Sequence, residues 1–470
     1  MTTTASRRPN VLFFFTDDQR FDTLGALNNP KVITPNLDAL VARGTAFTNG
    51  YIMGGSSGAV CMPSRAMLHT GRTLYHIQQQ GQAVPDDHAL MGETLRGAGY
   101  RTFGTGKWHN GSRAYARSFT DGAEIFFGGM GDHWNVPACD FDPTGRYDQR
   151  INQTADFRTQ AVRQHTADHI RAGKHSSELF AEATVDCLQQ RAGDDDPFFA
   201  YVSFMAPHDP RTMPPEYLDM YDPAEVDLPA SFMPEHPFDN GELRIRDEVL
   251  AAFPRTEEEV RQHIAAYYAM ITHADAQIGR VLAALEHSGE ADNTIVVFAG
   301  DNGLAVGRHG LMGKQSCYEH SVHVPLVFAG PGVPGGETRD DFAYLLDIFP
   351  TVCDLTGAAI PASVEGHSLV PALRRAGDGA RDHLLFAYRN LHRAVRDERY
   401  KLIEYVVGDV RTTQLFDLHE DPDELRDLSG DAAHAGRIAS LRQRLRRWQT
   451  ELGDDQQGQG GPFWAGFGDA

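Results

Sequence analysis

The sequence lacks a long apolar run. No stretch of about 18 uncharged apolar residues occurs in the chain, although a membrane-spanning helix needs roughly that length. The N-terminal apolar run VLFFF, at 11–15, is also too short to be the apolar region of a signal peptide. We therefore expect a cytoplasmic protein that has no membrane partner.

Cysteine is scarce and scattered. The chain has five cysteines in 470 residues, and no two of them form a C-x-x-C pair. An odd number at irregular spacing argues against a disulfide framework, and the missing C-x-x-C pair argues against a thiolate zinc site. The cysteines are Cys61, Cys139, Cys187, Cys317 and Cys353.

Basic residues are outnumbered by acidic ones. Lysine and arginine total 43 against 64 aspartates and glutamates, which gives a formal net charge of −21. Nucleic-acid binding depends on a basic surface, so we expect no nucleic-acid partner. An anionic substrate would have to be attracted by a local basic pocket instead.

Short apolar runs alternate with helical patterns. The runs at 11–15, 198–204, 294–300 and 324–330 are rich in Val, Ile and Phe and do not alternate with polar residues, as is typical of buried parallel strands; the run at 100–106 is weaker. The segment 256–289 has a helical apolar face, a capping-box pattern at Thr256 and Glu259, and Gly289 at its end. This alternation predicts an α/β domain with a large, mostly parallel sheet flanked by helices.

The pattern of residues along the chain changes near residue 376. The segment AGDGARDH reads as a linker, and hairpin-like pieces and one basic amphipathic helix at 434–452 follow it. We therefore predict a catalytic domain at 1–375 and a small C-terminal α+β subdomain at 376–470 with a short antiparallel sheet, one helix and a mobile tail. Phe463, Trp464 and Phe467 are candidates to dock that tail.

Polar side chains follow four of the predicted strands. Acidic or amide residues follow two of them, and basic or histidine residues follow the other two. Ligands of open α/β sheets bind beyond the carboxyl ends of the strands, so these residues are expected to converge. Carboxylate and amide oxygens suit Ca²⁺ or Mg²⁺. The residues are Asp17, Asp18, Asp301 and Asn302, and Lys107, His109 and His208.

The stretch GAVCMPSRAMLHTGR, at 58–72, combines a thiol, a proline and an arginine. Pro63 suits the first turn of a helix, which places Cys61 at or just before a helix N-terminus. Such an end attracts anions, and Arg65 adds a fixed positive charge one turn on. A tetrahedral anion is therefore expected beside residue 61. A low-pKa thiolate, as in thiol phosphatases, is one alternative, but it has no need of a divalent cation.

From Cys61 to Arg72 the chain matches the pattern C-x-P-S-R-x-x-L-x-T-G-R at every defined position. In this it resembles the type I, formylglycine-dependent sulfatases of the alkaline-phosphatase-like superfamily. The resemblance extends over PNVLFFFTDDQRFDTLG, GYRTFGTGKWH, APHDP and GDNG…HGLMGKQS, from about residue 8 to 420. It implies an alkaline-phosphatase-like α/β fold.

The resemblance also implies a chemistry. Cys61 would be converted to Cα-formylglycine by a formylglycine-generating enzyme, and its hydrate would attack the sulfur of a sulfate ester. One Ca²⁺ would be bound by residue 61 and the strand-end oxygens. His208 or Lys314 would protonate the leaving oxygen, and His109 would accept the proton of the remaining hydroxyl. The implied metal ligands are Asp17, Asp18, Cys61, Asp301 and Asn302, and the implied catalytic residues are Cys61, Arg65, Lys107, His109, His208 and Lys314.

The segment 118–148 is rich in glycine and aromatic residues and resembles the pocket-edge insertions that vary among sulfatases. We expect this segment to bind the alcohol part of the substrate. The substrate would be a small-molecule or saccharide sulfate ester, either a sulfated carbohydrate or an aryl sulfate. The candidate substrate residues are His133, Trp134, Arg211, His309, His320 and His392.

Three other functions stay open at this stage. A phosphonate or phosphate ester hydrolase of the same superfamily is the first, although such relatives often have Asp-Gln and Asp-His where this chain has Asp17-Asp18 and Asp301-Asn302. The second is a binding protein in which Cys61 is never converted. The third is a cysteine-dependent phosphatase, whose activity would resist EDTA and be lost to thiol reagents.

Overall fold

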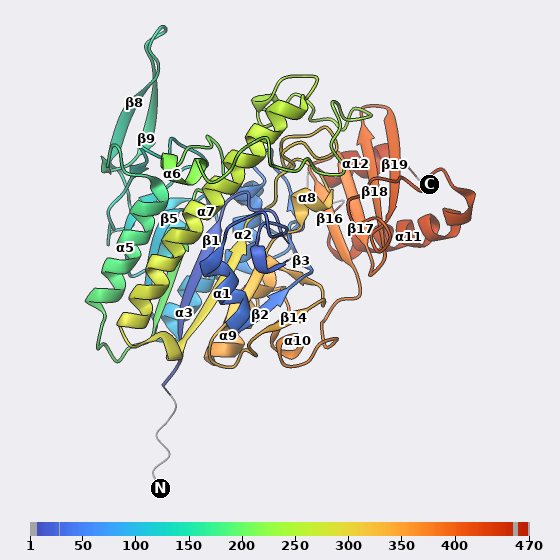
Figure 1. The fold of residues 1–470 in the computed structure, drawn as a ribbon. Coiled ribbons are helices and arrows are strands. Elements are labelled where there is room, and N and C mark those ends of the chain that lie inside the picture. Colours follow the sequence, from blue (N-terminus) through green and yellow to red (C-terminus); the bar gives the residue numbers. More distant parts are fainter. Residues whose placement is uncertain (1–6, 28, 455–458, 469–470) are drawn as a thin grey trace.

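The computed structural model describes residues 7–27, 29–454 and 459–468. Its main layer is an eight-stranded sheet that crosses the middle of Figure 1. In spatial order its strands are Glu337–Arg339 (β14), Gly44–Phe47 (β2), Leu326–Ala329 (β13), Thr294–Gly300 (β12), Asn10–Thr16 (β1), Phe198–Ser203 (β11), Arg101–Lys107 (β5) and Asp121–Phe126 (β6).

Most neighbouring strands of this sheet are parallel, which confirms the predicted fold class. β1 lies between β12 and β11 and is parallel to both, with Phe13 opposite Val297 on one side and Tyr201 on the other. The expected direction of the run at 324–330 was wrong, because β13 is antiparallel to β12 and to β2. The reason is that Leu326 pairs with Ala299 near the end of β12, so the connection between these strands stays at one edge of the sheet.

Helices cover both faces of the sheet. Side chains alternate between the faces of a strand, so Leu12 and Phe14 of β1 join one core while Phe13 and Phe15 join the other. The first core includes residues of α1 (Pro35–Arg43), α5 (Ser176–Gln190) and α7 (Glu257–His287); the second includes residues of α2 (Cys61–Thr70), α3 (Met91–Gly97) and α9 (Ile348–Thr356).

The long helix α7 begins where the sequence predicts it. The Thr256 side chain accepts a hydrogen bond from the backbone N–H of Glu259, and Gly289 follows the helix with a positive φ of 75°. In Figure 1 this helix runs beside α5 along the outside of the sheet. Its buried residues Ile278 and Val281 belong to the same core as Leu12 and Phe14 of β1.

A second sheet contains the C-terminal strands and one strand from the N-terminal part of the chain. Gly54–Gly55 (β4) pairs in parallel with Leu384–Tyr388 (β16), and antiparallel strands follow it at His392–Arg396 (β17), Tyr400–Val407 (β18) and Val410–Asp417 (β19). This sheet therefore contains strands from both sides of residue 376. The predicted division at 375/376 stays a prediction.

The C-terminal segment is more ordered than we expected. Helix α11 (Ala435–Glu451) is the predicted amphipathic helix, and a second helix, α12, spans Gly460–Phe467. Phe463, Trp464 and Phe467 are buried, as the docking alternative expects, and the mobility of the tail stays a prediction. Residues 455–458 and 469–470 of that tail lie outside the described residues.

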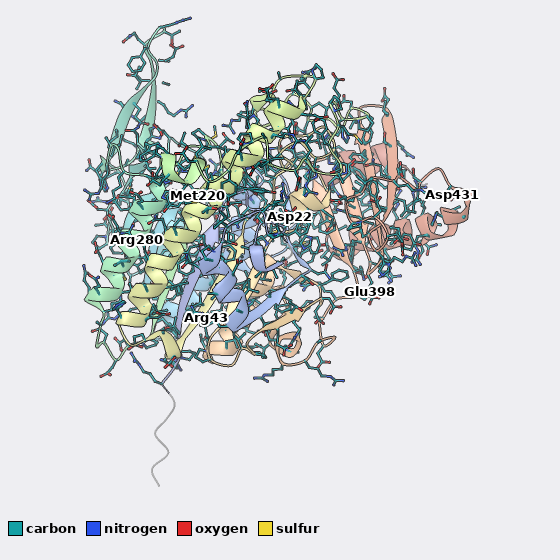
Figure 2. All side chains as sticks on the ribbon, in the orientation of Figure 1. Asp22, Arg43, Met220, Arg280, Glu398 and Asp431 are labelled. Atoms are coloured by element: carbon teal, nitrogen blue, oxygen red, sulfur yellow. The ribbon has the colours of Figure 1, made fainter. Side chains whose placement is uncertain are left out.

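The remaining elements are short or peripheral. A hairpin of Arg150–Asp156 (β8) and Ala161–Thr166 (β9) projects from the body in Figure 1, and Figure 2 shows side chains filling the space between the other ribbons. Within the described part of the chain, no helix has both the length and the apolar character that a membrane span requires. The other helices and strands are Ser112–Ser118 (α4), Pro215–Leu218 (α6), Glu319–Val322 (α8), Val370–Arg374 (α10), Gly50–Tyr51 (β3), Pro137–Ala138 (β7), His169–Ile170 (β10) and Ala343–Tyr344 (β15).

Candidate active site

The carboxyl ends of four adjacent parallel strands meet at one edge of the main sheet. β12, β1, β11 and β5 lie side by side, and the chain leaves each of them into a predicted site residue or a short loop that carries one. Asp17 follows β1, Asp301 follows β12, Lys107 ends β5 and His208 follows β11. The expected convergence of these strand ends is confirmed.

The acidic residues form a buried cluster with residue 61. Ligand atoms of Asp17, Cys61 and Asp301 all lie within 4.8 Å of one another, and a second such group contains Asp17, Asp18 and His208. The Asn302 side-chain amide donates to Asp18 Oδ1 at 2.7 Å. The sequence patterns thus locate one site that is made by residues far apart in the chain.

Three cations face this acidic cluster. Arg65 Nε lies 2.9 Å from Asp301 Oδ2, and Arg65 Nη2 lies 3.5 Å from Asp17 Oδ2. Lys107 forms an ion pair with Asp17, and Lys314 Nζ lies 2.5 Å from Asp18 Oδ1. All of these side chains are almost completely buried. Local positive charge of the kind that an anionic substrate needs is therefore present inside an acidic protein.

The carboxylates differ in how well they are compensated. Burial opposes ionisation of Asp17, but Lys107, His208 and Arg65 hold its pKa well below the usual value. Burial and the neighbouring Asp17 instead raise the pKa of Asp301 to about 6. Two carboxylates that share one buried site repel each other unless a further cation is present.

The donor atoms of the cluster fit a hard divalent cation. Asp17 Oδ1 and Asn302 Oδ1 are buried and have no hydrogen-bond partner among the described residues. Buried polar oxygens rarely stay unpaired in proteins, and oxygen donors of this kind are the usual ligands of Ca²⁺ and Mg²⁺. Asp17, Asp18, Asp301 and Asn302 are therefore able to hold such an ion.

Cys61 is the first residue of helix α2, as its proline and arginine context predicts. Its Sγ atom lies 3.4 Å from His109 Nδ1 and 3.5 Å from Lys107 Nζ. Burial raises the pKa of the Cys61 thiol to about 11, although Lys107 and Lys314 oppose the shift. Burial of the unmodified thiol thus works against the thiolate alternative.

His208 and Lys314 lie on the Asp18 side of the cluster. His208 Nε2 is 3.7 Å from Asp18 Oδ2, and His208 Nδ1 pairs with the backbone carbonyl of Asp209 at 2.8 Å. Lys314 reaches Asp18 from the connection between β12 and β13. His109 and Lys107 contact residue 61 instead, so the cluster has a basic group on each side.

Three further residues position this site and were missed by sequence reasoning. Ser64 Oγ donates to the Asp301 carbonyl at 2.5 Å, Ser203 Oγ accepts from Arg65 at 2.6 Å, and the Tyr267 hydroxyl donates to the Asp18 carbonyl at 2.6 Å. Ser64 is part of the sequence motif and Ser203 ends a predicted strand, so both carried a usable signal. Tyr267 is on a helix face with no such signal.

The expected substrate residues are mostly not in the cluster. His133 is buried. Its Nδ1 atom lies 2.7 Å from Ser176 Oγ, and its Nε2 atom lies 2.9 Å from the His208 carbonyl oxygen, so this ring contacts the backbone of the loop that carries His208. Trp134 packs edge-on against His175. Arg211 contacts His263 Nδ1 at 2.6 Å and is only partly buried.

The remaining three histidines of that expectation make contacts within the protein. His309 binds the Glu424 carbonyl at 3.1 Å and stacks on Tyr318, and His392 binds the Asn240 carbonyl at 2.7 Å. His320 is buried beside His309. Both rings pack against Tyr318 and against each other.

The sequence also matches a family model over most of its length. The model described as Sulfatase matches residues 9–358, and one described as N-sulphoglucosamine sulphohydrolase, C-terminal, matches residues 307–451. The chain belongs to the sulfatase family. It is therefore a sulfuric ester hydrolase, and the resemblance seen in the motif at 61–72 is confirmed at the family level.

Relatives and solved structures agree with this assignment. An ulvan-active sulfatase of Formosa agariphila is 29% identical to this protein. The match covers 95% of the present chain and 82% of the relative. BT4656, solved with its substrate D-glucosamine-2-N,6-O-disulfate, has a TM-score of 0.76 at 23% identity and covers 95% of this chain and 99% of that one. A phosphonate monoester hydrolase of Agrobacterium radiobacter has a TM-score of 0.73 at 24% identity, with coverage of 95% and 96%. These structures share the fold, which sulfate and phosphonate hydrolases both use.

Proposed function

We propose that this sulfatase hydrolyses sulfate esters of carbohydrates, with a Cα-formylglycine made from Cys61 as nucleophile and one Ca²⁺ as cofactor. The observation that carries the proposal is the cluster of Asp17, Cys61 and Asp301, whose ligand atoms lie within 4.8 Å of one another at a helix N-terminus. Maturation requires a formylglycine-generating enzyme as a transient partner.

Four residues of the cluster would hold the calcium ion. Their oxygens include two buried atoms that have no hydrogen-bond partner in the described part of the chain, which supports the assignment. When bound, Ca²⁺ supplies positive charge for the sulfate oxygens and for the acidic cluster itself. The residues are Asp17, Asp18, Asp301 and Asn302.

The groups around residue 61 are arranged for attack on sulfur. The hydrated aldehyde supplies the hydroxyl that displaces the alcohol from the sulfate ester. Lys107 and Arg65 lie next to Asp17 and Asp301, where they stabilise negative charge on the sulfate oxygens. His109, whose ring nitrogen is 3.4 Å from the side chain of residue 61, accepts the proton of the remaining hydroxyl so that sulfate leaves.

Protonation of the leaving alcohol is assigned to the Asp18 side of the cluster. His208 and Lys314 both lie beside Asp18, whereas His109 lies beside residue 61. Either group donates a proton to the leaving oxygen, and the Lys314 ammonium also stabilises the transferring sulfate. This separation assigns the acid and the base to different residues.

The substrate class is proposed from the relatives. The ulvan-active sulfatase acts on a sulfated carbohydrate, and so does BT4656, which was solved with a disulfated glucosamine as its substrate. No helix among the described residues could span a membrane and direct the enzyme to lipids. A sulfated sugar is therefore the proposed substrate, and an aryl sulfate is a suitable chromogenic probe.

The proposal is tested by mass spectrometry and kinetics on the same sample. The tryptic peptide 44–65 is expected to be lighter by about 18 Da than the cysteine form, which is the change from thiol to aldehyde. Turnover of 4-nitrophenyl sulfate should scale with the converted fraction and stop in EDTA. If an arylphosphonate monoester of the same alcohol had the higher kcat/KM, the phosphonate alternative would replace the sulfatase reaction.

A further inference from the structure

A short segment of the chain, residues 246–248, contacts both loops that carry the acid side of the active site. It lies between α6 and α7, far in sequence from His208 and Lys314 and outside the sulfatase motifs. Its first residue binds the loop of His208, and its other two residues bind the loop of Lys314. The 246–248 segment thus links two groups that reach the site from different strands of the main sheet.

Glu248 binds the backbone that precedes Lys314. Its Oε1 atom accepts a hydrogen bond from the Gly313 N–H at 2.8 Å, and its Oε2 atom accepts one from the Met312 N–H at 2.8 Å. The buried Arg255 guanidinium also donates to Oε2 at 2.8 Å, which compensates the carboxylate charge. Because a buried backbone N–H is costly to leave unpaired, this carboxylate fixes the two peptide groups that lead into Lys314.

Asp247 binds the residue that follows Lys314. The Gln315 side-chain amide donates to Asp247 Oδ2 at 2.7 Å and to the Gly58 carbonyl, just before α2, at 2.8 Å. The amide oxygen of Gln315 accepts a hydrogen bond from the Lys314 N–H at 3.0 Å. The backbone of Lys314 is therefore held on both sides, and its ammonium reaches the acidic cluster from a fixed origin.

Arg246 binds the residue that follows His208. Its guanidinium pairs with both carboxylate oxygens of Asp209, and its Nη1 atom lies 2.7 Å from Asp209 Oδ1. The same Nη1 atom donates to Asp247 Oδ1 at 3.1 Å. His208 pairs through Nδ1 with the Asp209 backbone carbonyl at 2.8 Å, which leaves Nε2 on the side of Asp18. The orientation of the His208 ring thus depends on a residue that Arg246 holds.

We propose that the three residues of the 246–248 segment are positioning residues for protonation of the leaving alcohol. They act through His208 and Lys314, whose loops they hold at one spacing beside Asp18. This inference rests on the proposed function, since it assumes that one of those two groups protonates the leaving oxygen. It adds that a segment outside the sulfatase motifs sets the geometry of that step.

The test compares two leaving groups on the same enzyme sample. 4-Nitrophenol leaves readily as an anion, whereas phenol depends more on protonation while the S–O bond breaks. Loss of a well-positioned acid therefore slows phenyl sulfate more than 4-nitrophenyl sulfate. The readout is the ratio of kcat/KM for 4-nitrophenyl sulfate to kcat/KM for phenyl sulfate, which does not depend on how much of the sample is folded and carries formylglycine.

Two variants change the segment. In Glu248→Gln an amide nitrogen replaces one acceptor oxygen, so one of the two backbone N–H groups before Lys314 loses its partner. We expect kcat/KM to fall about 100-fold for phenyl sulfate and about tenfold or less for 4-nitrophenyl sulfate, since a misplacement of about 1 Å has an effect of this size. The ratio therefore rises. Asp247→Asn should raise the ratio as well, because its one oxygen cannot face both Arg246 and Gln315.

Asp347→Asn is the matched control. Asp347 is also a buried carboxylate that accepts hydrogen bonds from two backbone N–H groups and pairs with an arginine, Arg381. This control should lose stability as Glu248→Gln does, yet keep the wild-type ratio. An unchanged ratio in both segment variants, or an equal rise in Asp347→Asn, would overturn the positioning role. If wild-type enzyme that contains formylglycine hydrolyses neither ester, the proposed function fails instead.

Discussion

The Nδ1 atom of His109 lies 3.4 Å from the Sγ atom of Cys61. Burial, Lys107 and Arg65 keep the pKa of His109 well below its usual value, so the imidazole is neutral and can accept a proton. We expect His109→Ala to release the alcohol once and then stall before sulfate leaves, with kcat lowered by about 10²- to 10⁴-fold. A stopped-flow burst of 4-nitrophenol, compared with sulfate measured by ion chromatography, tests this.

A matched variant makes the result specific. His287→Ala removes an exposed histidine of α7 and should keep wild-type kinetics. If His109→Ala released sulfate and alcohol at equal rates from the first turnover, His109 would not be the base that expels sulfate. The distance to residue 61 would then reflect packing alone.

A second prediction concerns the cation. Asp17→Asn removes a carboxylate that is within ligand distance of both Cys61 and Asp301. Wild-type enzyme should contain about one calcium by elemental analysis and gain roughly 3 kcal/mol of stability when free Ca²⁺ is 100-fold above Kd. Asp17→Asn should bind no calcium and show no Ca²⁺-dependent shift of Tm. Asp292→Asn, an exposed acidic residue, should behave as wild type; equal calcium in Asp17→Asn would reject the site.

The acidic cluster could be predicted from the sequence because its residues follow strands that are easy to recognise. Asp17 and Asp301 come directly after β1 and β12, and adjacent parallel strands necessarily bring their ends together. The helix that begins at Cys61 could also be predicted from the sequence, since Pro63 marks its first turn. Local signals suffice where the fold class itself sets the long-range geometry.

Other features depend on contacts that no local pattern records. Gly54–Gly55 has none of the apolar residues of a typical strand, yet it joins the C-terminal sheet through β16. His309 and His392 carry the same chemistry as catalytic histidines, but their ring nitrogens meet backbone carbonyls of distant segments. Whether a histidine faces a substrate or the protein is decided by tertiary packing, so the substrate role of these residues stays a prediction.

A third prediction concerns stability in acid. His133, His175 and His273 form a buried cluster in which ring centroids of neighbouring residues are 5.1 and 4.5 Å apart. Burial lowers the pKa of His175 to about 2 and that of His273 to about 4. The unfolded chain takes up protons below about pH 6.5 and the folded protein does not, so stability falls as the pH drops from about 6.5 towards 4.

The size of this effect is measurable by urea unfolding at several pH values. Each neutral histidine should cost up to about 2 kcal/mol of the free energy of unfolding at about pH 5, relative to pH 7. His273→Gln should remove one such contribution and flatten the pH profile, while His419→Gln, on an exposed residue, should leave the profile unchanged. A profile with the same slope in His273→Gln and wild type would show that the residue is already protonated in the fold.

The last prediction tests the strand that joins the two sheets. Gly54 has a φ of +96°, and a Cβ atom there would lie 2.1 Å from the Ala387 carbonyl oxygen in β16. Gly54→Ala must therefore break the β4–β16 pairing or strain the backbone. We expect a loss of more than about 3 kcal/mol, since strain and a lost packing contact add.

Gly357→Ala separates strain from contact, because Gly357 has a φ of +71° with nothing within 4 Å of its Cβ position. That variant should lose only about 1 kcal/mol, which is the backbone term alone. The difference between the two losses, taken from urea unfolding, measures the pairing of β4 with the C-terminal sheet. Since Ser56 follows β4 and leads to Cys61, Gly54→Ala should also lower kcat, and equal stability losses in the two variants would mean that the sheets do not depend on this pairing.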